Sequence, residues 1–170
     1  MGEEPLYTLK PLSAPRKSWP RASEGYRPLS GIRVIDFSRV IAAPVISKLL
    51  AVLGADVLKV TSSKLPDLAI TWVDLSAGKR DTDVNMKQEK GREIFKRLVE
   101  SADVLIDGYR PRVLERLGFD SATLRKINPS LVYLRENYYG FKGPLPIVPD
   151  GSRSATVSSA SHGFKENSWG

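Results

Sequence analysis

The sequence contains no cysteine, and its one histidine is His162. The lack of cysteine excludes disulfide bridges, thiolate zinc sites and cysteine nucleophiles. One histidine in an irregular stretch argues against a histidine metal cluster and against a Ser-His-Asp triad. Neither G-x-x-x-x-G-K-[ST] nor G-x-G-x-x-G occurs, so both common phosphate-loop motifs are absent as well. We therefore predict no metal site and assign no catalytic residue from motifs of this kind.

Long apolar stretches are also missing. No segment approaches the roughly 20 apolar residues that a transmembrane helix needs. The first residues, Met1 to Pro5, are followed by neither the apolar run of a signal peptide nor the arginine-rich pattern of a transit peptide. These absences predict a soluble intracellular protein without a membrane partner.

What the chain does contain is an ordinary globular composition with a basic excess. Its 170 residues are 41% hydrophobic and 26% charged, which fits one domain with a buried core. The net charge of +7 favours anionic partners such as nucleic acid, a membrane surface or a phosphorylated small molecule. Because no long Lys/Arg run occurs and acidic residues are interleaved, a mildly basic solvated surface is the simpler explanation.

The clearest structural pattern covers residues 29–60. Residues 32–37 form a β-branched run of strand length, and residues 56–60 form another. Between them Pro44 fits the first turn of a helix, apolar residues recur at helical spacing, and Gly54 can end the helix. Strand, helix and strand within about 30 residues predict a parallel βαβ unit with a right-handed crossover.

The same alternation continues as far as residue 134, which predicts an α/β fold with a largely parallel sheet. Only the segment 61–87 is less regular, with a turn-like stretch at its centre. Further strands are expected at 104–107 and 131–134, and helices at 88–101, 113–117 and 121–127.

Three side-chain expectations accompany these elements. Ile94, Phe95, Leu98 and Val99 recur at helical spacing and are expected to face the core. Ser121 is expected to cap the helix that follows it. Asp36, at the end of the first strand, could be a functional residue, but a turn or capping residue is the simpler interpretation.

The two ends of the sequence differ from this middle. Five prolines punctuate residues 1–28 without a helical or strand period, so we predict a Pro-rich linker. Ser, Gly and Pro dominate residues 145–170, where we predict an irregular, disordered tail. The folded domain is therefore expected at 29–144.

Loops after three of the strands are candidate binding segments, because ligands of open α/β sheets bind beyond the carboxyl ends of the strands. They cover residues 38–43, 61–64 and 108–112. Basic residues gather around the last of them, and the planar guanidinium group of arginine donates two hydrogen bonds to a phosphate at once. A multiply phosphorylated ligand is one interpretation. The other is a set of surface arginines paired with Asp107, Glu115 and Asp120. The basic residues are Arg110, Arg112 and Arg116, with Lys79, Arg80 and Lys87 in addition.

An ordered series of short motifs runs through residues 28–144. It opens with PLSGIRVIDFS at 28–38, AAP at 42–44 and LGADVLKV at 53–60, and continues with GKR at 78–80 and NMK at 85–87. It is densest at ADVLIDGYRP (102–111) and VLERLGF (113–119), and closes with INP at 127–129 and YGFKGP at 139–144. In this order the series resembles the CaiB/BaiF family, the family III CoA-transferases.

The resemblance implies an α/β fold with a Rossmann-like, largely parallel sheet and flanking helices, incomplete relative to the family, that holds coenzyme A. Family III enzymes transfer CoA between carboxylic acids, and two chains interlock as a homodimer. Acyl-CoA or CoA is then the expected partner, and the family's compartments are the cytoplasm, mitochondrion or peroxisome. By the resemblance, CoA contacts fall on Val40, Ile41, Ala42, Lys79, Arg80, Lys87, Tyr109, Arg110 and Arg116.

The family's catalytic residues have no counterpart in this sequence. The aspartate that forms an acyl anhydride lies downstream of the GP motif at 143–144, as do the histidine and aspartate of the racemases. RENYYG at 135–140 resembles a fungal-type branch that continues with a stretch like HRSGWQQ, whereas residues 146–152 here read PIVPDGS. The hypothesis is a truncated chain that arose by a frameshift, mis-splicing or a pseudogene.

We therefore predict a truncated CoA-transferase-like protein with CoA-binding elements and no complete active site. One alternative is a non-catalytic acyl-CoA or nucleotide-binding module, which would bind CoA without turnover. Another is a relative of the 2-methylacyl-CoA racemases. A basic nucleic-acid-binding domain is a third, but interleaved aromatics and recognition-helix patterns are missing, so no nucleic-acid partner is expected.

Overall fold

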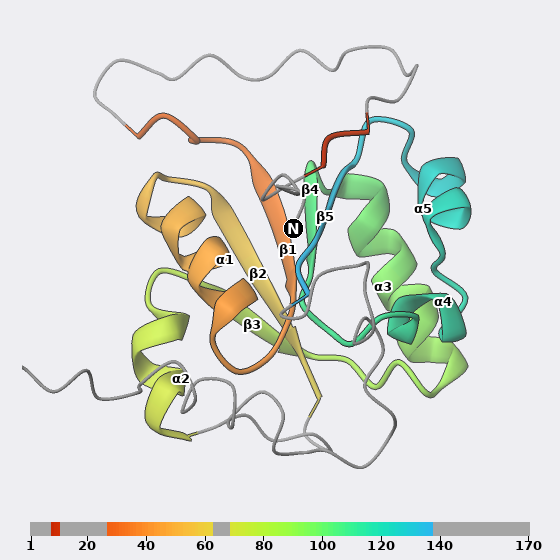
Figure 1. The fold of residues 1–170 in the computed structure, drawn as a ribbon, viewed down its shortest axis with the longest axis horizontal. Coiled ribbons are helices and arrows are strands. Elements are labelled where there is room, and N and C mark those ends of the chain that lie inside the picture. Colours follow the sequence, from red (N-terminus) through yellow and green to blue (C-terminus); the bar gives the residue numbers. More distant parts are fainter. Residues whose placement is uncertain (1–7, 11–26, 63–68, 138–170) are drawn as a thin grey trace, which may run out of the picture.

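The computed structural model describes residues 8–10, 27–62 and 69–137, and its centre is a parallel sheet (Figure 1). The strands are β1 (Arg33–Phe37), β2 (Asp56–Thr61), β3 (Arg80–Asp83), β4 (Val104–Asp107) and β5 (Val132–Arg135). Their order across the sheet is β3-β2-β1-β4-β5, and each neighbouring pair is parallel. The α/β prediction is confirmed.

Helices cover both faces of this sheet. They are α1 (Ala42–Val52), α2 (Ala69–Ser76), α3 (Glu89–Ser101), α4 (Val113–Arg116) and α5 (Ser121–Ile127). Figure 1 places α1 and α2 on one side of the sheet and α3, α4 and α5 on the other. No helix of the described ranges is long and apolar enough to cross a membrane.

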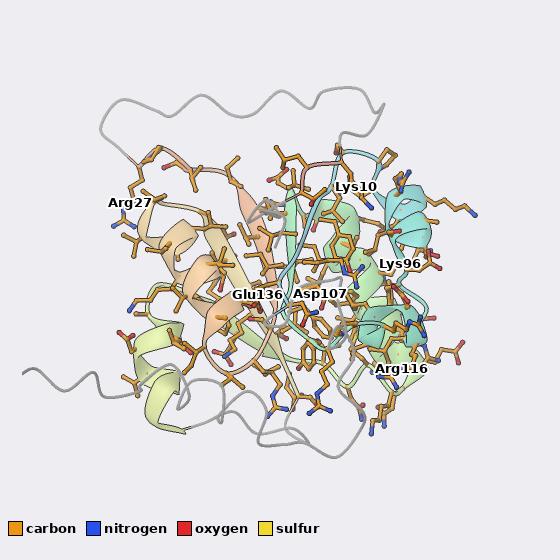
Figure 2. All side chains as sticks on the ribbon, in the orientation of Figure 1. Lys10, Arg27, Lys96, Asp107, Arg116 and Glu136 are labelled. Carbon is orange, nitrogen blue, oxygen red and sulfur yellow. The ribbon has the colours of Figure 1, made fainter. Side chains whose placement is uncertain are left out.

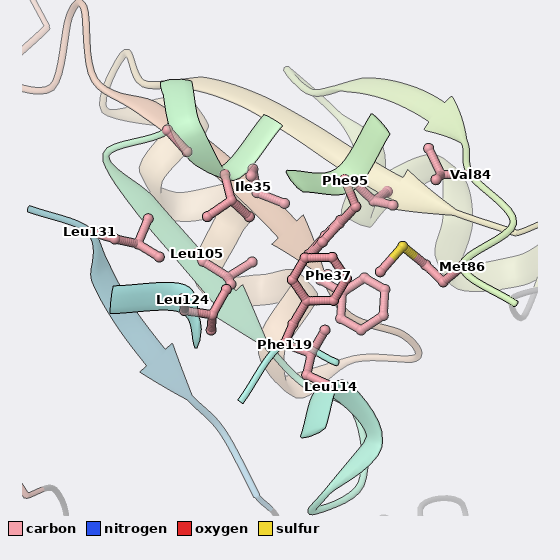
Figure 3. Close-up of a cluster of buried hydrophobic side chains, with 13 residues drawn as sticks. Ile35, Phe37, Val84, Met86, Phe95, Leu105, Leu114, Phe119, Leu124 and Leu131 are labelled. Atoms are coloured by element: carbon pink, nitrogen blue, oxygen red, sulfur yellow. The ribbon is translucent and has the colours of Figure 1, made fainter. Parts of the chain in front are cut away.

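The two-residue alternation of β1 divides the buried core into two clusters. Ile35 and Phe37 point toward α3, into the cluster shown in Figure 3. Val34, on the opposite face, packs with the apolar side chains of α1 and β2. In the first cluster the Phe95 ring lies 5.4 Å from the Phe37 ring and 4.9 Å from that of Phe119, measured between centroids. Each such contact contributes about 0.5–1.5 kcal/mol beyond burial.

Most elements begin and end within two residues of their predicted positions, but α2 and β3 are not found by sequence analysis. The sequence of β3 is Arg-Asp-Thr-Asp, and most of its residues are exposed. A polar edge strand carries no apolar alternation, so only its pairing with β2 defines it.

Two side-chain expectations are wrong. Ile94 is 40% exposed, whereas Phe95 and Val99 are fully buried. One step along a helix rotates a side chain by about 100°, which turns Ile94 toward solvent while Phe95 and Val99, four residues apart, share the buried face. The cap of α5 is Asp120 and not Ser121, because the Asp120 carboxylate accepts hydrogen bonds from the first backbone N–H groups of the helix.

The predicted linker over 1–28 lies outside the described residues except for 8–10 and 27–28. The predicted tail over 145–170 lies outside them entirely. These boundaries, and that of the domain at 29–144, stay predictions.

Candidate functional site

The strand order creates a topological switch point between β1 and β4. β1 pairs with β2 on one side and with β4 on the other, and the helices that follow these two strands cover opposite faces of the sheet. In open α/β sheets the loops at such a point leave in opposite directions, and ligands bind between them, beyond the carboxyl ends of the strands. We use the word crevice for the region between the two loops. The two loops are residues 38–41 and 108–112, which are among the predicted binding segments.

Gly108 lets these two loops approach each other closely. A Cβ atom at this position would lie 2.4 Å from the Ala43 Cβ and 2.8 Å from the Ser38 Cβ. The Gly108 N–H also donates a hydrogen bond of 3.1 Å to the Phe37 carbonyl. The structure therefore brings together segments that are about 70 residues apart in the sequence, and it does so through a residue without a side chain.

Backbone strain occurs on both sides of the crevice. Within the described residues two non-glycine residues have positive φ: Val40 at 70° in the first loop, and Arg112 at 67° in the second. The left-handed conformation costs an L-residue about 1–2 kcal/mol, and it is most unusual for a β-branched residue such as valine. Strain of this kind concentrates at ligand sites and switch regions.

The first turn of α1 adds a favourable field for an anion. No side chain caps this helix at Ile41, and no acidic residue occurs in its first turn. The N-terminus of an α-helix carries a partial positive charge, and its backbone N–H groups can bind phosphate or carboxylate. The predicted contacts at Val40, Ile41 and Ala42 therefore lie where a negatively charged ligand would be stabilised.

The predicted basic contacts do not all lie at this crevice. Arg110 is exposed within the second loop, Arg116 is exposed on α4, and Lys87 is exposed beyond the carboxyl end of β3. Figure 2 labels Arg116 on the side of the sheet that α3, α4 and α5 cover. Arg80, in contrast, bonds the carboxylate of Asp56 at the beginning of β2, so its guanidinium is directed toward the opposite end of the sheet.

Lys79 is directed into the protein. Its ammonium group lies 2.9 Å from the Asp36 carboxylate, and the two side chains are 1% and 0% exposed. It also donates hydrogen bonds to the Ser47 hydroxyl at 2.6 Å and to the Pro44 carbonyl at 2.9 Å. Asp36 further accepts from Ser47 at 2.6 Å and from Ser38. We call Asp36, Ser38, Pro44, Ser47 and Lys79 the buried brace.

The buried brace corrects the interpretation of Asp36 as a turn or capping residue. A charged residue inside a β-branched strand is buried when its neighbours are, and it then needs a partner. This pattern is visible in the sequence at Asp36. Its partner Lys79 is 43 residues away, and no spacing rule connects the two.

A second polar cluster joins the ends of β4 and β5. The Asp107 carboxylate accepts a hydrogen bond of 2.8 Å from the Tyr133 hydroxyl and one of 3.2 Å from the Tyr109 N–H. Burial raises the pKa of Asp107, although both hydrogen bonds and the charge of Arg135 act to lower it. Burial also raises the pKa of Tyr133, so its hydroxyl stays a donor. Figure 2 labels Asp107 near the middle of the view, and the residue is 6% exposed.

This cluster positions the second loop. Tyr109 follows Asp107 by two residues, and its half-buried ring packs on Phe37 with 4.3 Å between centroids. The Glu136 N–H donates to the Asp107 carbonyl at 2.9 Å, and burial raises the pKa of the Glu136 carboxyl group. A pairing of Asp107 with surface arginines is one interpretation of the sequence, whereas its contact with Tyr133, 26 residues away, is not predicted.

A surface groove of about 620 Å³ lies elsewhere, between α3 and α5. None of its lining residues belongs to loops 38–41 or 108–112, and Glu89, Glu93 and Glu100 are among them. Arg92, Lys96 and Lys126 also line this groove, so its charges are mixed. We place the candidate site at the switch point because ligands of open α/β sheets bind there. No group of three or more His, Asp or Glu residues in the described ranges could hold a metal ion.

Comparison with known proteins identifies the family. The sequence profile of the CoA-transferase family III matches residues 29–155. An acetyl-coenzyme A transferase of Hypoxylon pulicicidum is 37% identical over 140 residues, which cover 78% of this chain and 24% of that protein. The beta subunit of a succinyl-CoA–L-malate CoA-transferase of Chloroflexus aurantiacus is 40% identical over 141 residues, covering 75% of this chain and 35% of the subunit.

Solved structures agree with the sequence comparisons. A hypothetical protein of Mycobacterium tuberculosis superposes with a TM-score of 0.67 at 30% identity, over 85% of this chain and 41% of that one. A CaiB/BaiF family protein of Brucella suis gives a TM-score of 0.64 at 33% identity, over 70% and 35%. The present chain thus spans between about a quarter and two fifths of the length of these relatives. With three quarters of its residues inside the family profile, the chain belongs to the CoA-transferase family III.

Proposed function

We propose that the crevice at the switch point binds coenzyme A, and that this binding is the contribution of the described residues to a CoA-transferase reaction. The observation that carries the proposal is the meeting of loops 38–41 and 108–112 at Gly108, directly beyond β1 and β4. Coenzyme A carries three phosphates, which suits a site with an uncapped helix N-terminus and exposed arginines. No metal takes part in the proposal.

The proposed contacts divide into two groups. The backbone at Val40, Ile41 and Ala42 faces the ligand at the N-terminus of α1, where the partial positive charge of the helix stabilises a phosphate. Arg110 and Arg116, which are exposed, supply charge from the other side of the crevice. Lys87 and Tyr109 stay predicted contacts at its margins. Arg80 is not assigned a contact, because its ion pair with Asp56 directs it elsewhere.

Calorimetric titration of the full chain with CoA tests this proposal, with dephospho-CoA as the matched ligand. We expect CoA to bind more tightly than the form without the 3′-phosphate. The exchanges Arg110→Met and Arg116→Met should each weaken CoA binding about tenfold, the effect of one charge-assisted hydrogen bond. Arg125→Met is the matched control, because Arg125 is also an exposed arginine and lies on α5. A folded chain that binds no CoA would refute the proposal.

Transfer, assembly and compartment are further parts of the proposal. Two of the Chloroflexus relatives are an alpha and a beta subunit, which supports assembly of two family chains. We propose a homodimer, for which sedimentation equilibrium should give twice the mass of 18.8 kDa.

Incubation with an acyl-CoA and a carboxylic acid tests transfer, and binding without turnover would favour a non-catalytic module. Localisation in the cytoplasm, mitochondrion or peroxisome is tested by fractionation.

A further inference from the structure

We infer that Lys79 serves the proposed CoA site as a positioning residue, acting through Asp36 and the first turns of α1, and that it is not a phosphate ligand. This inference rests on the proposed function and changes the role that the resemblance implies for Lys79. Its basis is the geometry of the buried brace.

The ammonium group of Lys79 has no donor left for a ligand. A protonated lysine has three N–H donors. Within the described part of the chain its acceptors include the Asp36 carboxylate at 2.9 Å, the Pro44 carbonyl at 2.9 Å and the Ser47 hydroxyl at 2.6 Å, which is one for each donor. A phosphate could bind only if it displaced one of these acceptors. The displaced acceptor would then stay buried without its hydrogen bond from Lys79.

The burial of Lys79 also argues against direct contact with a phosphate. The side chain of Lys79 is 1% exposed and that of Asp36 is 0% exposed, so solvent and solutes do not reach the ion pair. Ser38 and Ser47 are also buried, at 1% and 0%. Arg110 and Arg116, in contrast, are exposed to solvent, where a ligand can approach them.

The buried brace joins the strand and the helix that flank the first loop to the segment before β3. Asp36 belongs to β1, Ser38 begins the loop, Pro44 and Ser47 belong to α1, and Lys79 directly precedes β3. Between Ser38 and Pro44 the chain passes through Val40 in its strained conformation, with φ at 70°. A strained residue persists only where its surroundings over-determine it. We infer that the buried brace supplies this constraint and so holds the N-terminus of α1 toward the crevice.

The test compares two variants of the full chain, Lys79→Met and the double variant Asp36→Asn/Lys79→Met. Lys48→Met is the matched control, since Lys48 lies on α1 in a partly exposed ion pair with Asp74 at 2.6 Å. Each protein is titrated with CoA and with dephospho-CoA, and amide hydrogen exchange is followed in loop 38–43 and in β4 and β5.

If Lys79 is a positioning residue, Lys79→Met weakens both ligands by the same factor, roughly tenfold. The ratio of the two dissociation constants then stays at its wild-type value. Exchange accelerates in loop 38–43 while the amides of β4 and β5 keep their protection. The double variant recovers part of the affinity, because it leaves no unpaired carboxylate in the interior. Lys48→Met leaves both affinities unchanged.

Other outcomes overturn the inference. If Lys79→Met or the double variant loses the preference for CoA over dephospho-CoA, Lys79 binds the 3′-phosphate directly, and the proposed function still stands. Wild-type affinity in Lys79→Met also overturns the inference. Should Lys79→Met fail to fold, the double variant is used instead, and its ratio of the dissociation constants for CoA and dephospho-CoA tests the inference in the same way. A wild-type chain that binds neither ligand overturns the inference and the proposed function together.

Discussion

Replacement of Gly108 by alanine tests whether the close approach of two loops forms the site. The added Cβ would lie 2.4 Å from the Ala43 Cβ and 2.8 Å from the Ser38 Cβ. Carbon atoms in contact prefer about 3.5–4.0 Å, so the loops must separate by about 1 Å. Neither neighbouring atom can move alone, because each Cβ is fixed to its own backbone. We therefore expect Gly108→Ala to displace loop 108–112 from loop 38–41.

The expected cost follows from this geometry. Overpacking of a well-packed site costs about 1–3 kcal/mol. Alanine also reduces the freedom of the unfolded chain, which returns about 0.4–1 kcal/mol. The net loss in the free energy of unfolding should be about 1–2 kcal/mol. With an m value of about 2 kcal/mol per molar urea, the midpoint of urea unfolding falls by roughly 0.5–1 M.

Two other glycines separate steric overlap from backbone conformation. Gly118 has φ at +88°, and a Cβ added there would meet nothing within 4 Å, so Gly118→Ala costs only the left-handed strain, about 1 kcal/mol. A Cβ at Gly91 would meet the Asn85 carbonyl at 2.1 Å, but Gly91 lies in α3. Gly91→Ala should lower stability without a specific effect on CoA binding. Equal CoA affinities in Gly91→Ala and Gly108→Ala, or an unchanged urea midpoint for Gly108→Ala, would refute the reasoning.

Four further predictions concern buried and capping groups. Lys79→Met should cost about 3–5 kcal/mol in urea unfolding, because it leaves the buried Asp36 carboxylate unpaired, and the added exchange Asp36→Asn should recover part of this loss. Asn128→Ala should cost about 2 kcal/mol, because the buried Asn128 amide donates at 2.9 and 2.8 Å to carbonyls at the end of α3. The stability that Asp107 contributes should be present below its ordinary pKa of 3.8 and lost as pH rises through its raised pKa, so wild type should lose stability relative to Asp107→Asn as pH rises above that ordinary value. Asp120 should show the opposite sign, because hydrogen bonds from the first turn of α5 lower its pKa and its contribution is lost as pH falls.

Urea unfolding at a series of pH values checks the last two predictions in one experiment. The free energy of unfolding of wild type, relative to that of Asp107→Asn, must fall as pH rises. Relative to that of Asp120→Asn, it must fall as pH is lowered. Parallel pH dependences in the two variants would contradict the assignment. For Asn128, an alanine variant as stable as wild type would show that water replaces the lost hydrogen bonds. If Lys79→Met is as stable as the double variant, the unpaired Asp36 carboxylate does not destabilise the protein, and the prediction for Lys79 is wrong.

The sequence by itself was sufficient for elements whose pattern is local. β1, α1 and β2 follow from a β-branched run, a helical period ended by glycine, and a second β-branched run. Each of these depends on residues within a few positions of one another, where backbone sterics and burial on one face decide the conformation. The two loops of the candidate site were found for the same reason, since each follows directly from the end of a predicted strand.

Only the tertiary structure decided which of the predicted basic residues can meet a ligand. Lys79 and Arg80 are neighbours in the sequence, yet one is buried against Asp36 and the other is exposed beside Asp56. The edge strand β3 and the contact between Gly108 and Ser38 likewise exist only because strands distant in the sequence pair. Sequence patterns report the period of one segment. The partners of a side chain depend on strand order and register, which place residues 43 or 70 positions apart within hydrogen-bonding or van der Waals distance.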